Sequence, residues 1–80
     1  MTRRKRSIRM RPYPGSSSIV AAGYSANDRV FRARFPRGRE YDYLNVPPKV
    51  YRGVLDADSK GRFVNLQIKP HYDYEEVVRE

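Results

Sequence analysis

Positively charged side chains are the groups in this sequence best suited to chemistry, and the chemistry they suit is the binding of phosphate. The 80 residues include 17 Lys and Arg against 9 Asp and Glu, a formal net charge of +8. Six cations fall within the first eleven residues, with no acid among them: Arg3, Arg4, Lys5, Arg6, Arg9 and Arg11. This basic arm has two interpretations, an electrostatic clamp on phosphates or a solubilising tail, and the sequence leaves both open.

A second group of arginines lies between Asp28 and Glu40, where no acid interrupts it. Arg37 and Arg39 flank Gly38, directly after Pro36, and this composition is typical of a loop. We therefore expect both arginines at a loop tip that phosphate can reach, and Arg62 joins them as a candidate ligand. The predicted nucleic-acid-binding residues are Arg3, Arg4, Lys5, Arg6, Arg9, Arg11, Arg37, Arg39 and Arg62.

Catalytic chemistry has few candidates in this chain. There is no Cys, which excludes a disulfide scaffold, a thiolate metal site and a Cys nucleophile. The single histidine, His71, cannot form a multi-histidine site, and the serines follow no nucleophile-elbow pattern. We expect a protein that is not an enzyme and needs no metal or cofactor. No stretch approaches the roughly 20 apolar residues of a membrane span, so we expect no membrane partner.

The elements that must position these residues begin with three predicted strands at residues 17–24, 29–35 and 39–44. In the second strand Phe31, Ala33 and Phe35 alternate with Arg32 and Arg34. A three-residue loop at 36–38 then fixes a hairpin register, with four pairs: Phe31–Tyr43, Arg32–Asp42, Ala33–Tyr41 and Arg34–Glu40. The two charge pairs fall on the outer face, where each should contribute about 0.2–1 kcal/mol.

The same register decides how Tyr41 and Tyr43 are interpreted. Their spacing beside arginines could form a platform on which bases stack. The register instead places them on the face of Phe31 and Phe35, so we favour a role in the core, with a hydroxyl reaching its edge. The predicted core residues are Phe31, Phe35, Tyr41, Tyr43, Val50 and Leu55.

A helix is predicted after Val46-Pro47-Pro48, because Pro is well tolerated in a first helical turn. Val50, Tyr51, Val54 and Leu55 then share one apolar face. Residues 60–69 are ambiguous. Val64, Leu66 and Ile68 alternate like a strand, whereas a cap at Ser59 and a stop at Pro70 suit a helix.

An ordered series of short motifs resembles the KTSC domain, a small bacterial and phage module named for its occurrence at the C-terminus of some lysyl-tRNA synthetases. The matching motifs include Ser17-Ser18-Ile19, Gly23-Tyr24, Phe31-x-Ala33-x-Phe35, Tyr41-x-Tyr43, Val46-Pro47, Val50-Tyr51 and Ala57-x-Ser59-x-Gly61. The resemblance covers roughly residues 16–73. It implies a helix rather than a strand at residues 60–69, and RNA binding in a family whose function is largely unassigned.

Together these features predict an α+β fold with a three-stranded antiparallel sheet, followed by one or two short helices packed on one face. Residues 1–15 are expected to be a disordered basic arm and linker, residues 16–72 a KTSC-like domain, and residues 73–80 an acidic tail. The predicted function is non-catalytic nucleic-acid binding, with RNA preferred. The alternative is a small phage or bacterial regulator that binds an acidic host protein surface. No apolar signal-peptide core follows the basic start, so we expect a cytoplasmic protein.

Overall fold

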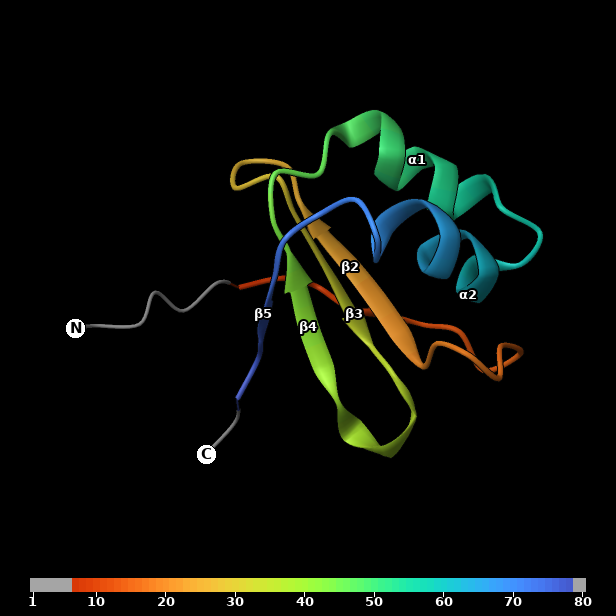
Figure 1. Cartoon of the computed structure of the whole chain (residues 1–80). Helices are drawn as coiled ribbons and strands as arrows, with labels where there is room; N and C mark the ends of the chain where they lie inside the picture. The colour runs from red at the N-terminus through yellow and green to blue at the C-terminus, as the bar shows by residue number, and fades with distance from the viewer. Residues whose placement is uncertain (1–6, 79–80) are drawn as a thin grey trace.

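A five-stranded antiparallel sheet with helices on one face forms the part of the chain that the computed structural model describes, residues 7–78 (Figure 1). The strands, in sheet order, are β1 (Arg11–Pro12), β2 (Ala21–Ser25), β3 (Val30–Arg34), β4 (Glu40–Tyr43) and β5 (Tyr74–Glu76). The helical elements are the 3-10 turn η1 (Pro36–Gly38), α1 (Pro48–Asp56), α2 (Lys60–Phe63) and the π-helix η2 (Val64–Ile68) that continues α2. Within residues 7–78, every helix is too short or too polar to cross a membrane.

The predicted α+β class is confirmed, but the sheet has five strands and not three. The extra strands lie in segments predicted to be a disordered arm and an acidic tail: β1 pairs with β2 and β5 pairs with β4. The tail is also held outside β5, because the backbone N–H of Val77 donates to the carbonyl of Glu40 at 2.8 Å. Strands this short carry too few residues for an alternating pattern to reveal them.

The central hairpin has the register derived from the sequence. Phe31 pairs with Tyr43, Arg32 with Asp42, Ala33 with Tyr41, and Arg34 with Glu40. The turn η1 joins the two strands, and Gly38 adopts φ 78°, a left-handed conformation that glycine enters without steric cost. The two hairpin strands begin and end one residue inside their predicted bounds, as fraying ends usually do, whereas the first predicted strand, residues 17–24, begins only at Ala21.

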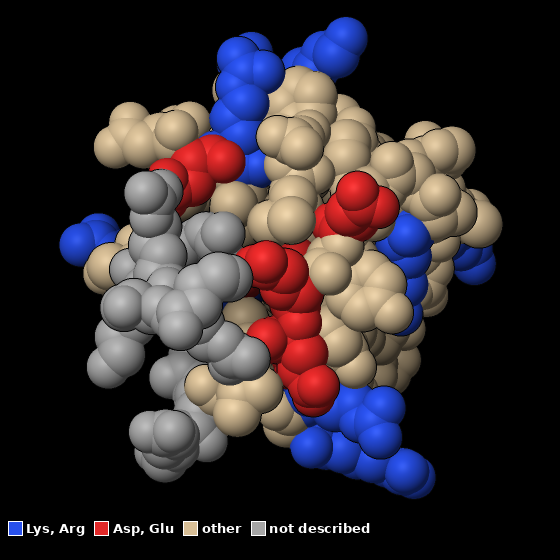
Figure 2. Space-filling model, turned by 60° about the vertical axis from the view of Figure 1, so that its left-hand side comes forward, with Lys and Arg blue, Asp and Glu red and all other residues tan. Residues whose placement is uncertain are grey.

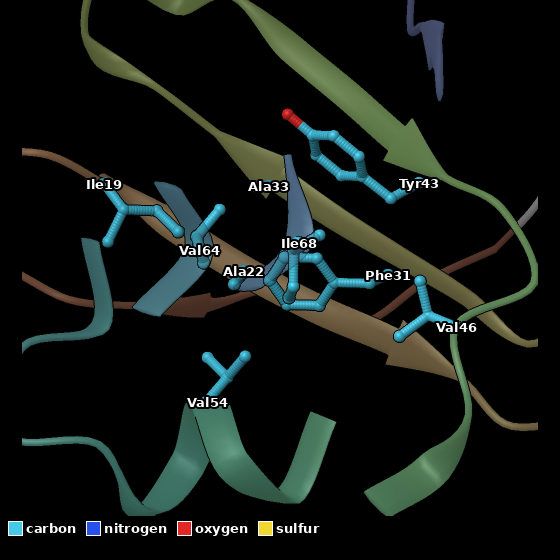
Figure 3. Close-up of a cluster of buried hydrophobic side chains, with 9 residues drawn as sticks. All are labelled: Ile19, Ala22, Phe31, Ala33, Tyr43, Val46, Val54, Val64 and Ile68. Atoms are coloured by element: carbon cyan, nitrogen blue, oxygen red, sulfur yellow. The ribbon is translucent and has the colours of Figure 1, made fainter. Parts of the chain in front are cut away.

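The inner face of the sheet and the helices enclose the core. Figure 3 shows Val54 of α1 pointing towards Ala22 and Phe31 of the sheet. The fully buried cluster consists of Ile19, Ala22, Phe31, Ala33, Tyr43, Val46, Val54, Val64 and Ile68. Of the six predicted core residues, Phe31 and Tyr43 are buried, whereas Phe35, Tyr41, Val50 and Leu55 are half-buried.

Residues 60–69 are helical, so the strand interpretation of this segment is wrong. The Ser59 side chain caps α2 by accepting a hydrogen bond from the backbone N–H of Arg62 at 3.3 Å. Val64 and Ile68, four residues apart, are both buried, but Leu66 between them is 60% exposed. Burial therefore follows the helical spacing and not the alternation that suggested a strand.

The outer face of the sheet differs most from prediction, because the Arg32–Asp42 pair and Glu40 are buried, and only Arg34 of the two charge pairs is half-buried. Arg32 is 7% exposed, Glu40 3% and Asp42 2%. The Arg32 guanidinium donates to both Asp42 carboxylate oxygens, at 2.6 Å and 3.0 Å, and lies 3.8 Å from Glu40. The hydrogen bond to Asp42 is the main reason that the pKa of Arg32 is raised. These residues are therefore not a solvated face worth a few tenths of a kcal/mol per pair.

The segment before β1 crosses the outer face of β2. A Cβ on Gly23 would collide with the carbonyl oxygen of Arg9 and the side chain of Ile8. Gly23 pairs with Arg32, so the segment passes over the same row of the sheet as the buried ion pair. Figure 1 shows it running behind the strands towards the β5 side. The expectation of a disordered arm is therefore wrong for residues 8–12, and Arg3 to Arg6 lie outside the described residues.

Gly23→Ala should destabilise the protein by about 1–3 kcal/mol, because the added methyl group overpacks the contact with Ile8 and Arg9. Its φ is not positive, so the substitution has no backbone penalty. Urea melts of the full chain measure the loss. In a chain that lacks residues 1–10, the same substitution should be close to neutral, and an equal loss in both chains would show that the segment does not lie on Gly23.

Candidate nucleic-acid interface

The hairpin tip carries two of the predicted phosphate ligands. Arg37 and Arg39 lie in and beside η1, and both side chains are exposed. Neither forms an ion pair with another residue in the part of the chain that the structure describes. Arg37 has φ 74° and ψ 15°, a left-handed conformation that costs a non-glycine residue of the order of 1 kcal/mol. Arg37 thus presents its side chain at the tip of the β3–β4 hairpin from a strained backbone conformation.

The other predicted ligands are not brought to this tip. Arg11 lies in β1, the edge strand at the end of the sheet opposite β5, and Arg9 precedes it over Gly23. Arg62 is exposed on α2 and lines a separate hollow with Phe63 and Leu66. Arg3, Arg4, Lys5 and Arg6 lie outside the described residues. Of the predicted residues that the structure describes, only Arg37 and Arg39 share one loop.

A small hollow lies beside the hairpin, on the inner side of β4 and β5. Tyr41, Tyr43, Tyr74 and Lys69 line it, and its volume is about 240 Å³. The Lys69 ammonium lies 4.4 Å from the centroid of the Phe35 ring, and that ring lies 6.0 Å from the ring of Tyr41. Because Phe35 directly precedes η1, this contact places Lys69 next to the arginine-bearing tip.

Tyr74 and Lys69 were not among the nucleic-acid-binding residues predicted from the sequence. Tyr74 belongs to the segment predicted to be a loose tail, and Lys69 is the last residue of the ambiguous segment 60–69. The available signal was the repeat of Tyr-x-Tyr at residues 72–74, which matches the Tyr-x-Tyr at 41–43. Only the pairing of β5 with β4 brings Tyr74 opposite Tyr43.

The two tyrosines of β4 have different surroundings. Tyr43 is 3% exposed, and burial raises the pKa of its phenol to about 12. Tyr41 is half-buried, and its ring packs on Phe35 from one side and meets Tyr74 edge-on from another. Tyr43 therefore belongs to the core that we favoured for both, although it also lines the hollow, whereas Tyr41 packs against the core and leaves more of its ring exposed.

Carboxylates surround the β5 side of this region. Asp73, Glu75 and Glu76 are all exposed. With the β5 side turned forward, Figure 2 shows Asp and Glu in a central band and Lys and Arg at its margins. An anionic ligand would consequently meet favourable potential at the hairpin tip and unfavourable potential along β5.

No group of three or more His, Asp or Glu among residues 7–78 lies close enough to hold a metal ion. His71 is exposed.

Comparison with known proteins places this small α+β domain in a family. The model of the KTSC domain matches residues 15–72. The chain belongs to the KTSC domain family, as the resemblance in sequence suggested. The crystal structure of a KTSC domain protein from Yersinia pestis has a TM-score of 0.82 and 30% sequence identity, over 90% of this chain and 100% of that one.

Two relatives of similar length carry no stated function. A protein of Tsukamurella paurometabola is 46% identical over 57 residues, which cover 71% of this chain and 85% of that protein. An uncharacterized protein of Stutzerimonas stutzeri is 42% identical over 60 residues, or 74% and 84% of the two chains. A lysine–tRNA ligase of Nostoc punctiforme is 31% identical over 64 residues, which are 80% of this chain but only 11% of that enzyme.

Proposed function

We propose that this protein is a non-catalytic module that binds single-stranded nucleic acid, with RNA preferred, through phosphate contacts at the hairpin tip. The observation that carries the proposal is the exposure of Arg37 and Arg39 on a rigid hairpin, with no carboxylate partner among the described residues. Guanidinium groups bind phosphate through paired hydrogen bonds. The strain at Arg37 supports a functional reason for keeping an arginine there.

The preference for RNA rests on two weaker arguments. Aromatic rings beside cations are typical of surfaces that bind unpaired bases, and the hollow next to the tip supplies such rings. In addition, one relative is named a lysine–tRNA ligase, an enzyme that handles RNA, although this chain matches only a small part of it.

The double variant Arg37→Gln/Arg39→Gln should bind single-stranded RNA roughly tenfold more weakly or worse, because two charged hydrogen-bond donors to phosphate are lost. The slope of log affinity against log salt should also flatten by about 1.4, since each phosphate contact on a single strand contributes about 0.7. Fluorescence anisotropy on a labelled oligonucleotide at several salt concentrations measures both quantities. Neither arginine packs in the core, so the melting temperature should stay within a few degrees of the parent.

A matched control comes from α1. Lys49→Gln/Arg52→Gln removes the same charge from two exposed residues of that helix. We expect this control to weaken binding much less than the hairpin variant does. Equal losses in the two variants would mean that binding follows net charge and that the hairpin tip is not the phosphate site.

A further inference from the structure

The hollow beside the hairpin is built from rings that leave part of their surface uncovered. The rings of Tyr41 and Tyr74 meet edge-on, with centroids 5.4 Å apart, and those of Tyr43 and Tyr74 are tilted at 6.0 Å. None of these contacts is a parallel stack, so the rings do not fully cover one another's faces, and part of each face stays available to a ligand. Tyr74 is 62% exposed and is the only aromatic residue among the large exposed hydrophobic residues described.

The size of the hollow limits what it can hold. Its volume of about 240 Å³ lies below the roughly 300–1,000 Å³ of sites that enclose drug-sized ligands. A single planar ring system fits such a space, whereas a folded peptide motif or a larger cofactor does not.

Tyrosine rings can bind either a planar ring or a cation, and the positive charge of Lys69 at the rim decides which of these ligands fits the hollow. A cluster of tyrosines can surround a quaternary ammonium ion, but the ammonium of Lys69 at the rim would repel it. The same ammonium favours a neutral ring attached to an anionic group. Arg37 and Arg39 extend this positive potential beyond Phe35, the ring on which Lys69 lies.

We infer that this hollow is a subsite for one unpaired nucleobase, which stacks on the exposed ring of Tyr74 and meets Tyr41 edge-on, while Lys69 contacts the adjoining phosphate. The inference rests on the proposed function and assigns β5 a role in it, because β5 alone brings Tyr74 to the site. The carboxylates of β5 repel phosphate and so limit the direction in which the bound nucleic acid can leave the hollow. Glu76 pairs with Tyr41 on the β5 side of the hollow, whereas Lys69 lies on Phe35 at the β3 side, so the phosphate backbone leaves the hollow on the Lys69 side, away from Glu76.

The test compares two labelled probes of equal length and charge, a single-stranded oligouridylate and the same backbone with abasic residues. The parent chain should bind the oligouridylate more tightly. Tyr74→Ala should lower that affinity roughly 5- to 150-fold, the equivalent of about 1–3 kcal/mol per stacked base, and leave binding of the abasic probe unchanged. Tyr74→Phe should keep most of the affinity, because it retains the ring.

Tyr74 also covers part of Tyr43, so Tyr74→Leu serves as a second variant that keeps apolar bulk without an aromatic face. Its affinity for the oligouridylate should fall like that of Tyr74→Ala, with an unchanged melt. Leu66→Ala, at another exposed apolar residue, is the control and should bind normally.

Equal binding of both probes by the parent, or full affinity in Tyr74→Leu, would overturn the base subsite and leave the phosphate site standing. Failure of the parent to bind either probe would overturn the proposed function and the subsite together.

Discussion

Arg32→Ala should destabilise the protein by about 3–5 kcal/mol, although a surface charge pair in a sheet would contribute less than about 1 kcal/mol. Arg32 is 7% exposed and holds both oxygens of Asp42, which is itself 2% exposed. Removing the guanidinium leaves buried negative charge without its main compensation. Urea melts at neutral pH, fitted with a common slope, measure the loss of unfolding free energy.

Two variants separate burial of this pair from ordinary surface charge. Arg39→Ala, at an exposed arginine of the same hairpin, should change stability by less than about 0.5 kcal/mol. Arg32→Met/Asp42→Leu replaces both partners with apolar side chains and should recover much of the loss. A loss below about 1 kcal/mol for Arg32→Ala would contradict the burial of the outer face.

Phe31→Ala should be similarly costly, at about 3–5 kcal/mol, because it leaves a cavity at the centre of the core. Phe31 is fully buried, and its ring lies 6.3 Å from that of Tyr43 and 6.0 Å from that of Tyr51. Thermal and urea melts check the effect, and Phe31→Leu, which keeps most of the volume, should lose much less. Near-native stability of Phe31→Ala would invert the inner and outer faces assigned to β3.

Similar losses at Phe31 and Arg32 follow from one property of β3, which is that both of its faces are covered. Four of its five residues are buried. The alternation of apolar and charged residues identified the strand and its register correctly. It did not reveal that the charged face is covered, because burial of paired charges leaves the pattern of residue types unchanged.

One residue in the sequence did indicate that another segment covers the charged face of the sheet. Gly23 interrupts β2 opposite Arg32, and a glycine within a strand often marks the close approach of another backbone. Here the approaching backbone is that of Arg9. The composition of residues 1–11 suggested disorder, since it offers only Ile8 and Met10 for burial. A short segment can nevertheless be ordered by hydrogen bonds and contacts to an existing sheet edge.

The candidate site was predictable where it depends on local sequence. The turn at Pro36 to Gly38 placed Arg37 and Arg39 at an exposed tip without knowledge of the fold. Tyr74 and Lys69 reach the same region through the path of the chain after residue 68, which no local pattern determines. The resemblance to the KTSC domain predicted the helix in segment 60–69, where hydrophobic spacing alone slightly favoured a strand.

The most direct test of nucleic-acid binding is a salt titration of the full-length chain with a labelled single-stranded RNA, followed by fluorescence anisotropy. We expect about 4–6 phosphates to be neutralised by exposed cations. These include Arg9, Arg11, Arg37, Arg39 and Lys69, with part of the remaining basic residues. The slope of log affinity against log salt should then be about −3 to −4, at about 0.7 per phosphate on a single strand. Affinity that does not change with salt, or no binding at low salt, would contradict a phosphate-binding function and favour a protein partner.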